Sequence, residues 1–352
     1  MKILHCSDIH FGSKIESKFP KEKSDERKRE VRAAFLRMVE YAKRNNIGAI
    51  ILAGDIFDSD RPLKRDKEYF YSVVRNTPEI DFLYLCGNHD TMESYIEYGL
   101  ENLKTFSGEW TTYDYGDAVI SGIEINENNA LSLYSSLKLE RDKVNIVVLH
   151  GQVGSTAGMC KIQLSKLRNK NIDYLALGHI HTFSSGKIDE RGQYIYSGCL
   201  EGRGFDEIGE KGFVVIDTNE KISFKFVPNC SRVFEEVTVD ISGTQDIFTA
   251  YQKVLSFIKC KPSDIVRINL TGEVSYDTEG LDKEIEKQLA HKYYFVSVKN
   301  GVAVKYDASS VEGDVSLRGE FIREVMSSDY SEEDKTAIIT CGLKALRGGE
   351  VE

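Results

Sequence analysis

Short runs of almost wholly apolar residues recur from residue 1 to about residue 225, and they constrain the fold of this chain more than any other feature. The runs lie at 2–8, 49–55, 82–88, 117–125, 145–151, 174–181, 193–198 and 213–217. Several lack the alternating polar residues of a strand with a solvated face, so they predict strands buried on both faces. Between the first two runs, apolar residues from Val31 to Ala42 recur at helical spacing, with Ser24 as the expected N-cap. Buried strands separated by such helices predict an α/β sandwich, a layered sheet core with helices outside.

The pattern changes after about residue 228, which indicates more than one domain. At 352 residues the chain is long for a single compact core. Strand and helix patterns alternate as β-α-β-α-β from about 233 to 308, and two short amphipathic helices follow. We therefore expect a main domain at 1–228, a smaller α+β domain at 229–310 and a C-terminal helical segment at 311–352.

Composition and charge exclude several classes of protein. With 41% hydrophobic and 29% charged residues, the chain is typical of a globular protein. It contains no apolar stretch long enough to cross a bilayer and no signal-peptide layout, so we expect a cytoplasmic protein without a membrane partner. The seven cysteines are scattered without a C-x-x-C pair, which indicates reduced thiols. The net charge of −10 means that nucleic-acid binding would need a local basic surface or bound cations.

Five of the apolar runs end in side chains that can bind a metal ion. These side chains are Asp8 and His10, then Asp55, then Asn88 and His89, then His150, and finally His179 and His181. Functional sites in α/β sheets gather beyond the carboxyl ends of strands, so these termini can converge on one place. Of the seven histidines in the chain, all but His5 and His291 lie at these termini. We expect His5 to pack within a strand and His291 to be a solvated helix residue.

The expected ligands suit divalent cations. Carboxylate, imidazole and amide oxygen without thiolate favour an ion such as manganese, iron or zinc. The set exceeds the needs of one tetrahedral site and fits two ions about 3.5 to 4 Å apart that share a carboxylate. Two such cations lower the pKa of a water between them from about 15.7 toward about 7, so the nucleophile can be hydroxide. Taken singly, each motif is more often structural, and Gly54, Gly87 and Gly178 before the clusters could simply mark turns; together, the motifs favour a metal site.

In these motifs the chain resembles the calcineurin-like metallophosphoesterases. The family's blocks D-x-H, G-D-x-x-D, G-N-H-D/E, a strand-end H, and G-H-x-H are all present in order within about residues 1–185. The resemblance implies a four-layer α/β/β/α sandwich and a site with two divalent metal ions, with manganese as the expected metal and iron or zinc as alternatives. It also implies the ligands: Asp8, His10 and His181 for one ion, Asn88, His150 and His179 for the other, and Asp55 as the bridge. In the family, the residue at His89 protonates the leaving oxygen, and we expect Asp90 to orient its ring.

A second block is similar to that of SbcD-type DNA repair exonucleases within this superfamily, and the C-terminal segment at 311–352 resembles that of YhaO-type members. Arg203, Glu207, Lys211, Gly212 and Phe213 carry the similarity, whereas Ser197 and Cys199 stand where proline and serine are common. The resemblance implies that the domain at 229–310 caps the site and grips DNA. It further implies that the C-terminal segment docks on an SbcC-like coiled-coil ATPase and that the protein forms a homodimer.

Two residues near the expected site are candidates for contact with substrate. Arg203 belongs to the block just described, and Asp58 stands where several relatives have a histidine that helps to position the phosphate. Further candidates for DNA contact are the basic insertions at 14–32 and 58–75, in which Lys and Arg interleave with aromatic residues. The alternative interpretation of these insertions is a solvated helix face with ion pairs four residues apart.

These observations lead to the hypothesis of a metal-dependent DNA phosphodiesterase, an exonuclease with endonuclease action as a further expectation, working in double-strand-break repair and recombination. In this hypothesis a hydroxide between the metals attacks the phosphorus in line, and His89 protonates the departing sugar oxygen. One alternative is a small-molecule phosphatase or cyclic-nucleotide phosphodiesterase of the same superfamily. Another is a non-catalytic scaffold on an ATPase assembly.

Overall fold

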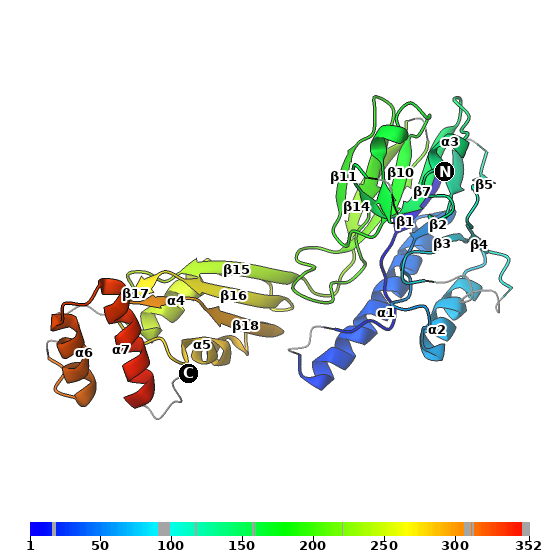
Figure 1. Ribbon diagram of the computed structural model, residues 1–352. Coiled ribbons are helices and arrows are strands. Elements are labelled where there is room, and N and C mark those ends of the chain that lie inside the picture. The colour runs from blue at the N-terminus through cyan, green and yellow to red at the C-terminus, as the bar shows by residue number, and fades with distance from the viewer. Residues whose placement is uncertain are drawn as a thin grey trace. The chain divides into compact units, whose positions relative to one another are not determined.

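The computed structural model describes residues 1–15, 19–90, 99–116, 118–156, 158, 160–219, 221–305, 311 and 313–346. It divides into two compact units, Met1–Phe234 and Glu235–Glu352 (Figure 1). The second unit includes both the smaller domain and the C-terminal helices. Among the described residues, no helix is both long and apolar enough to cross a membrane.

The first unit contains two six-stranded sheets. The strand order of one sheet is β14-β13-β1-β2-β3-β4, and that of the other is β11-β12-β10-β7-β6-β5. The first sheet consists of β1 (Lys2–Cys6), β2 (Ala49–Ala53), β3 (Asp81–Leu85), β4 (Leu103–Thr105), β13 (Gly212–Asp217) and β14 (Ser223–Pro228). The second consists of β5 (Thr111–Asp114), β6 (Ala118–Gly122), β7 (Val144–His150), β10 (Tyr174–Gly178), β11 (Ser184–Lys187) and β12 (Gln193–Tyr196). The strands β1, β2 and β3 are mutually parallel, as are β7 and β10, so their carboxyl ends share an edge within each sheet.

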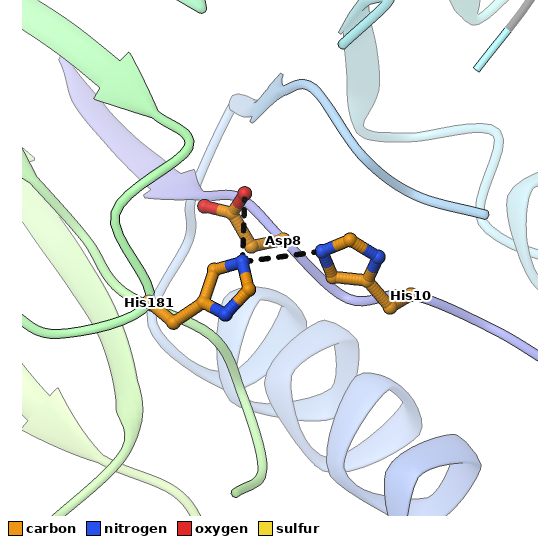
Figure 2. A group of neighbouring side chains, drawn as sticks. All are labelled: Asp8, His10 and His181. Atoms are coloured by element: carbon orange, nitrogen blue, oxygen red, sulfur yellow. Dashed lines mark hydrogen bonds and ion pairs between the residues drawn. The ribbon is translucent and has the colours of Figure 1, made fainter. Parts of the chain in front are cut away.

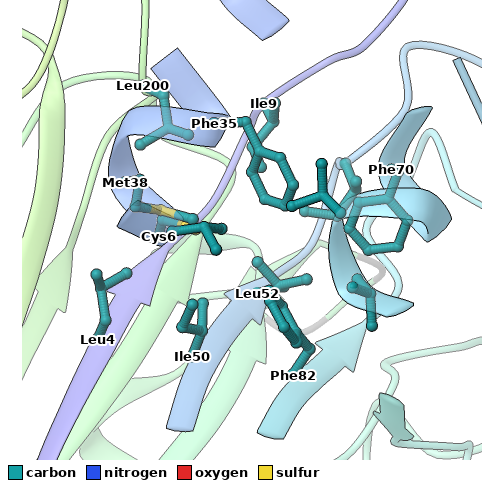
Figure 3. Packing of buried hydrophobic residues seen from close by; sticks show 14 of the residues in the cluster. Leu4, Cys6, Ile9, Phe35, Met38, Ile50, Leu52, Phe70, Phe82 and Leu200 are labelled. Atoms are coloured by element: carbon teal, nitrogen blue, oxygen red, sulfur yellow. The ribbon is translucent and has the colours of Figure 1, made fainter. Parts of the chain in front are cut away.

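Alternate residues of the central strands pack into different layers. In β2, Ile51 joins the apolar core between the sheets. Ile50 and Leu52 join the core beneath the helices (Figure 3). That outer core is closed by α1 (Lys21–Arg44) and α2 (Lys64–Arg75). On the far side of the second sheet, Leu149 and Leu175 pack with residues of the short helix α3 (Leu133–Ser136). Because each strand face is buried, polar alternation is absent, and the expected four-layer α/β/β/α sandwich is confirmed.

Helix α1 carries the predicted buried stripe but begins earlier than expected. Every apolar residue of the stripe is buried, including Phe35 and Met38. The N-cap is Pro20, and Ser24 lies one turn inside the helix, where its N–H donates to the Pro20 carbonyl at 3.0 Å. The prediction of a Ser24 cap is therefore wrong. Residues 21–23 are good helix formers, so the helix extends back to the proline, which cannot itself donate to the preceding turn.

The second unit has its own sheet and core. Its elements follow the expected order of strands and helices, and the sheet order is β15-β16-β18. Asp246 caps α4 by accepting a hydrogen bond from the N–H of Thr249. The helices α6 and α7 form a separate apolar cluster that includes Ile322 and Ile339. The bounds are β15 (Phe234–Asp240), α4 (Ile247–Phe257), β16 (Ile265–Thr271), β17 (Glu273–Val274), α5 (Leu281–Leu289), β18 (Phe295–Asn300), β19 (Ala303–Val304), α6 (Leu317–Ser327) and α7 (Glu332–Leu346).

Candidate metal centre

The strand ends of the first unit bring the expected metal-binding side chains together. Three neighbouring strands of the first sheet, β1, β2 and β3, lead into Asp8, Asp55 and Asn88, while β7 and β10 of the second sheet end at or just before His150 and His179. Three overlapping groups of side chains here could each hold a metal ion. The groups are Asp8 with His10 and His181, Asp8 with Asp55 and His150, and His10 with Asp58 and His89.

The backbone of this site is strained. Asp8, His10, Asp55 and His179 have φ values of 53°, 50°, 53° and 96°, in the left-handed region that residues with a Cβ seldom adopt. Each such residue costs on the order of 1 to 3 kcal/mol and persists only where the surrounding structure holds it. Among the described residues, four of the eight non-glycine residues with positive φ carry candidate ligands, which favours this strand edge as a functional site.

One group of ligands lies where the two sheets meet. Figure 2 shows Asp8, His10 and His181 turned toward one another. The Nε2 atoms of His10 and His181 are 3.3 Å apart, and His181 Nε2 is 3.8 Å from Asp8 Oδ1. The Asp8 carboxylate also accepts from the backbone N–H of His179, with distances of 3.0 and 3.1 Å to its two oxygens. Asp8 therefore belongs to a rigid arrangement that spans both sheets.

A second group surrounds the amide oxygen of Asn88. Asn88 Oδ1 lies 3.1 Å from His150 Nε2 and 3.1 Å from His179 Nδ1. Asp55 Oδ2 lies 3.4 Å from the same His150 Nε2 and 3.7 Å from His10 Nε2. Asp55 is thus placed between the two groups of side chains.

The hydrogen bonds around this second group show that its lone pairs converge. His150 Nδ1 is 2.9 Å from the Ala53 carbonyl, which can only accept, so Nδ1 carries the hydrogen. In the neutral ring, Nε2 then presents a lone pair toward the oxygens of Asn88 and Asp55. Electron-pair donors that point at one another repel unless a proton or a metal cation lies among them. Oxygen and imidazole donors of this kind fit a divalent cation, so the residues present suit a metal ion.

Local charge sets the protonation state of these groups in the ion-free chain. Burial alone would raise the pKa of Asp55, but hydrogen bonding and charge from His150 and His10 hold it well below its usual range. Burial lowers the pKa of both His10 and His179, so these rings are neutral near pH 7. Burial opposes the charge of His150, yet the neighbouring Asp55 raises its pKa to about 9 in the ion-free chain. A bound cation would take the place of that proton.

Position 87 requires glycine because Asp55 lies very close to its Cα. A Cβ at Gly87 would lie 2.0 Å from Asp55 Oδ1 and 2.5 Å from the Asp55 backbone nitrogen. Gly87 does not have a positive φ, so a turn does not explain this glycine. The position instead requires glycine because the Asp55 carboxylate occupies the space that a side chain would take.

His89 and Asp90 follow Asn88 but lie in different environments. The His89 ring is exposed, and its Nδ1 lies 3.2 Å from the Asp58 carbonyl. Asp90 is buried and accepts from the backbone N–H groups of Ile56 at 3.0 Å and Phe57 at 2.8 Å. This differs from the expectation that Asp90 orients the His89 ring. The turn after Asn88 directs the Asp90 carboxylate back into the sheet edge, where it supports the loop that carries Asp55.

The side chains of Asp58, Arg203 and Glu207 lie directly behind the first ligand group. Asp58 Oδ1 is 3.0 Å from His10 Nδ1, and Glu207 Oε1 is 2.7 Å from His181 Nδ1. Arg203 pairs with both carboxylates. These residues also line an open groove of about 480 Å³ together with Ser13, Lys14, Ile15, Gly204 and Asp206. Sequence reasoning named Glu207 within a family block but gave it no role.

Other expected residues lie elsewhere. His5 is fully buried with its Nδ1 2.9 Å from the Tyr174 hydroxyl, as expected for packing, and His291 is exposed. Part of the basic insertion at 14–32, residues 16–18, lies outside the described residues. Within that insertion Arg27 is fully buried, so it is not available to contact DNA. Lys64 remains exposed at the start of α2.

The chain is similar to known proteins in sequence. A family model described as calcineurin-like phosphoesterase matches residues 1–183. The uncharacterized metallophosphoesterase YhaO of Bacillus subtilis (strain 168) is 27% identical over 295 residues, covering 77% of this chain and 72% of YhaO. The DNA double-strand break repair protein Mre11 of Sulfolobus acidocaldarius is 23% identical over 358 aligned positions, covering 94% of this chain and 87% of that protein. Among solved structures, a dimetal phosphatase from Danio rerio has a TM-score of 0.48 at 14% identity, covering 65% of this chain and 96% of that one.

Proposed function

As a member of the calcineurin-like phosphoesterase family, the chain is a hydrolase of phosphoester bonds, and we propose that it is a metal-dependent DNA phosphodiesterase. We infer that it acts as an exonuclease in the repair of DNA double-strand breaks, with endonuclease action as a second mode, in the cytoplasm. The convergence of Asn88 Oδ1, Asp55 Oδ2 and His150 Nε2 on one place is the observation that supports metal dependence most directly.

Two divalent ions, manganese in this proposal, would be held by the side chains at the strand ends. Asp8, His10 and His181 would hold one ion, Asn88, His150 and His179 the other, and Asp55 would contact both. When bound, such ions supply positive charge to the phosphoryl oxygens and an activated water as nucleophile. The short distances within each group support this division, as does the position of Asp55 between the groups.

In the proposed mechanism His89 is the proton donor for the leaving oxygen. Its ring is exposed at the site while its backbone N–H donates to Asp55 Oδ1 at 2.9 Å, so the residue is anchored to the metal centre by its backbone. The Asp58 carbonyl can only accept, which leaves Nδ1 of His89 as the donor to it and turns Nε2 away from that contact. Nε2 is therefore the nitrogen that would face the substrate.

The extent of the similarity to other proteins supports DNA as the substrate. The match to the double-strand break repair protein covers 94% of this chain and so extends past the phosphoesterase domain through the second unit. A small-molecule phosphatase has no evident need for that unit. In the proposal the second unit grips DNA, and bound cations offset the net charge of −10 at the site.

The proposed partners are a second copy of this chain and an SbcC-like coiled-coil ATPase. The C-terminal helices support an ATPase contact because their buried faces pack on each other while Leu317 and Leu346 stay 67% and 47% exposed. Gel filtration of the chain alone tests the dimer. Co-elution with the purified ATPase, and its loss when Leu317 and Leu346 are changed to Glu, tests the docking.

The experiment that tests the function compares substrates for the purified chain. Single-stranded DNA, double-stranded DNA, a nucleotide monophosphate and a cyclic nucleotide are each incubated with Mn²⁺ and, in parallel, with EDTA. We expect DNA hydrolysis that requires the metal and is lost in the His89→Ala variant. Faster hydrolysis of the monophosphate or the cyclic nucleotide than of DNA would favour the small-molecule alternative. Absence of hydrolysis of every substrate would overturn the proposal.

A further inference from the structure

We propose that Asp58, Arg203 and Glu207 form a carboxylate–guanidinium–carboxylate bridge that fixes the ring tautomers of His10 and His181, so that both rings present Nε2 to one cation. The inference rests on the proposed metal-dependent function and assigns these three residues to the metal centre. This differs from the role expected from the sequence, in which Arg203 and Asp58 contact the substrate.

The contact between Glu207 and His181 is the firmest part of the bridge. The Glu207 side chain is only 2% exposed, and its Oε1 is 2.7 Å from His181 Nδ1. Arg203 Nη2 lies 3.0 Å from the same Nδ1 and forms a close ion pair with the same Oε1. A guanidinium can only donate and a carboxylate can only accept. Both N–H groups therefore point at Oε1, and His181 carries its hydrogen on Nδ1.

This arrangement makes Glu207 the residue that decides whether His181 can bind a metal. In a Gln at this position the one remaining carbonyl oxygen is held by the N–H groups of Arg203. His181 Nδ1 is then left beside groups that can only donate, which are Arg203 Nη2 and the amide NH2. The neutral ring would then have to carry its hydrogen on Nε2, and its lone pair would point away from the site. Loss of the Glu207 charge should consequently do more than remove one hydrogen bond, because it favours the tautomer that cannot bind.

Asp58 has the corresponding position on the other ring. Its Oδ1 lies 3.0 Å from the buried His10 Nδ1, at an angle short of a well-formed hydrogen bond. Among the described residues no other acceptor completes a hydrogen bond to that nitrogen. Arg203 Nη1 is 3.5 Å from the same Asp58 oxygen, and the Arg203 side chain is only 14% exposed. The guanidinium of Arg203 thus pairs with both carboxylates, so its N–H groups are already engaged.

The bridge contacts one nitrogen of each histidine ring, and the other nitrogen of each ring faces the metal site. On one side the Nδ1 atoms of His10 and His181 face carboxylates, and on the other side their Nε2 atoms face each other across 3.3 Å. A partner on the far nitrogen of a ligating histidine sets its tautomer and orientation, and loss of such a partner typically weakens metal affinity by about 10- to 100-fold. Asp58 and Glu207 are therefore positioning residues that act through the two histidines.

The test measures Mn²⁺ binding without substrate, by titration calorimetry and metal analysis. For Glu207→Gln and Asp58→Asn we expect one of the two ions to bind about 10- to 100-fold more weakly, with the second ion unaffected. The matched control is Asp173→Asn, because Asp173 also pairs through both oxygens with an arginine, Arg191, away from the site. The control should bind both ions as the unaltered chain does.

A double variant separates tautomer control from general loss of structure. In Glu207→Gln/Arg203→Met the donor that competes for His181 Nδ1 is gone, so we expect tighter Mn²⁺ binding than in Glu207→Gln alone. Equal or weaker binding in the double variant would overturn the inference. So would unchanged metal affinity in Asp58→Asn and Glu207→Gln with only a raised KM for DNA, because that result would make these residues substrate contacts.

Nuclear magnetic resonance of the ion-free chain, labelled with ¹⁵N at histidine and held at a pH where the His181 ring is neutral, reads the tautomer directly. We expect His181 to carry its hydrogen on Nδ1 in the unaltered chain and on Nε2 in Glu207→Gln. An Nε2–H tautomer in the unaltered chain would overturn the inference. Failure of the unaltered chain to bind Mn²⁺ at all would instead overturn the proposed function, so the two failures are distinguishable.

Discussion

His10 Nε2 and His181 Nε2 lie 3.3 Å apart although 171 residues separate them in the chain. His10 follows β1 of one sheet, and His181 follows β10 of the other. The candidate site is therefore built across the interface between the two sheets and exists only when they are packed correctly. This relationship makes metal binding a sensitive measure of the integrity of the first unit.

Replacement of Asp55 and of His89 should have different effects. His89→Ala should reduce DNA hydrolysis by about 10² to 10⁴-fold with both ions still bound, because the ring donates a proton and holds no metal. Asp55→Ala should lose the two-ion site, since its Oδ2 lies within 3.7 Å of His10 Nε2 and 3.4 Å of His150 Nε2. Metal analysis and turnover of the two purified variants check this. Loss of both ions from the His89 variant would contradict the assignment.

Removal of metal should destabilise the first unit. A bound metal ion would take the place of the His150 proton among the converging oxygen and nitrogen atoms, and a ligand at 100 times its Kd stabilises a folded protein by about 2.7 kcal/mol per site. Thermal unfolding with Mn²⁺ and with EDTA measures the difference. The Asp55→Ala variant serves as control and should show little change between the two conditions. Identical melting of the unaltered chain in both would be the contrary result.

In the ion-free chain, stability should fall as the pH rises above neutrality. Burial disfavours the charge of His150, but Asp55 raises its folded pKa to about 9, compared with 6.5 in the unfolded chain. A group with a raised folded pKa stabilises the fold fully below its unfolded pKa and loses that contribution as the pH passes its folded pKa. Thermal unfolding in EDTA between about pH 6.5 and 9 should show the fall. The fall in stability should be smaller in His150→Gln. An equal dependence of stability on pH in both chains would exclude His150 as the source of the fall.

A methyl group at Gly87 should displace Asp55. The added Cβ would lie 2.0 Å from Asp55 Oδ1, so Gly87→Ala should weaken Mn²⁺ binding and cost about 1 to 3 kcal/mol of stability. Gly154→Ala is the matched control because a Cβ there meets nothing within 4 Å. Calorimetry and urea unfolding measure both quantities. Normal Mn²⁺ affinity in Gly87→Ala would show that Asp55 can move without loss of the site.

Arg27 should be the costliest arginine to remove from α1. It is fully buried and its Nη2 donates to Glu201 Oε1 at 2.9 Å and to the Gly202 carbonyl at 2.7 Å. Arg27→Ala leaves Glu201 buried without this charge partner and should cost about 3 to 5 kcal/mol. Arg29→Ala, at an exposed position of the same helix, should cost less than about 0.5 kcal/mol. Urea unfolding of both variants checks the contrast.

The layered fold and the location of the candidate site could be predicted because they depend on patterns local in sequence. Continuous apolar runs indicate buried strands, and the parallel strands β1, β2 and β3 carry polar residues to a common edge. Gly87 could also be recognised from the sequence, because it stands directly before a polar cluster at the end of a strand. Its actual constraint, the Asp55 carboxylate beside it, is a contact across 32 residues that no local pattern contains.

The partners of the site residues could not be predicted for a related reason. Asp90 is adjacent to His89 in sequence, yet its carboxylate bonds the backbone of Ile56 and Phe57. The contact of Arg203 with Asp58 joins residues 145 positions apart. Such pairings depend on how loops from different strands pack against one another. Strained φ values such as that of Asp8 arise from the same tertiary constraints.

The order in which the site residues appear along the chain has a consequence for biosynthesis. Asp8 is made early and Glu207, the partner of His181, about 200 residues later. At roughly 5 to 20 residues per second, translation separates the two by about 10 to 40 seconds. During that interval the nascent chain displays carboxylates and imidazoles that have no complete coordination shell. The group formed by Asp8, His10 and His181 therefore obtains its Glu207 partner only when synthesis of the first unit is nearly finished.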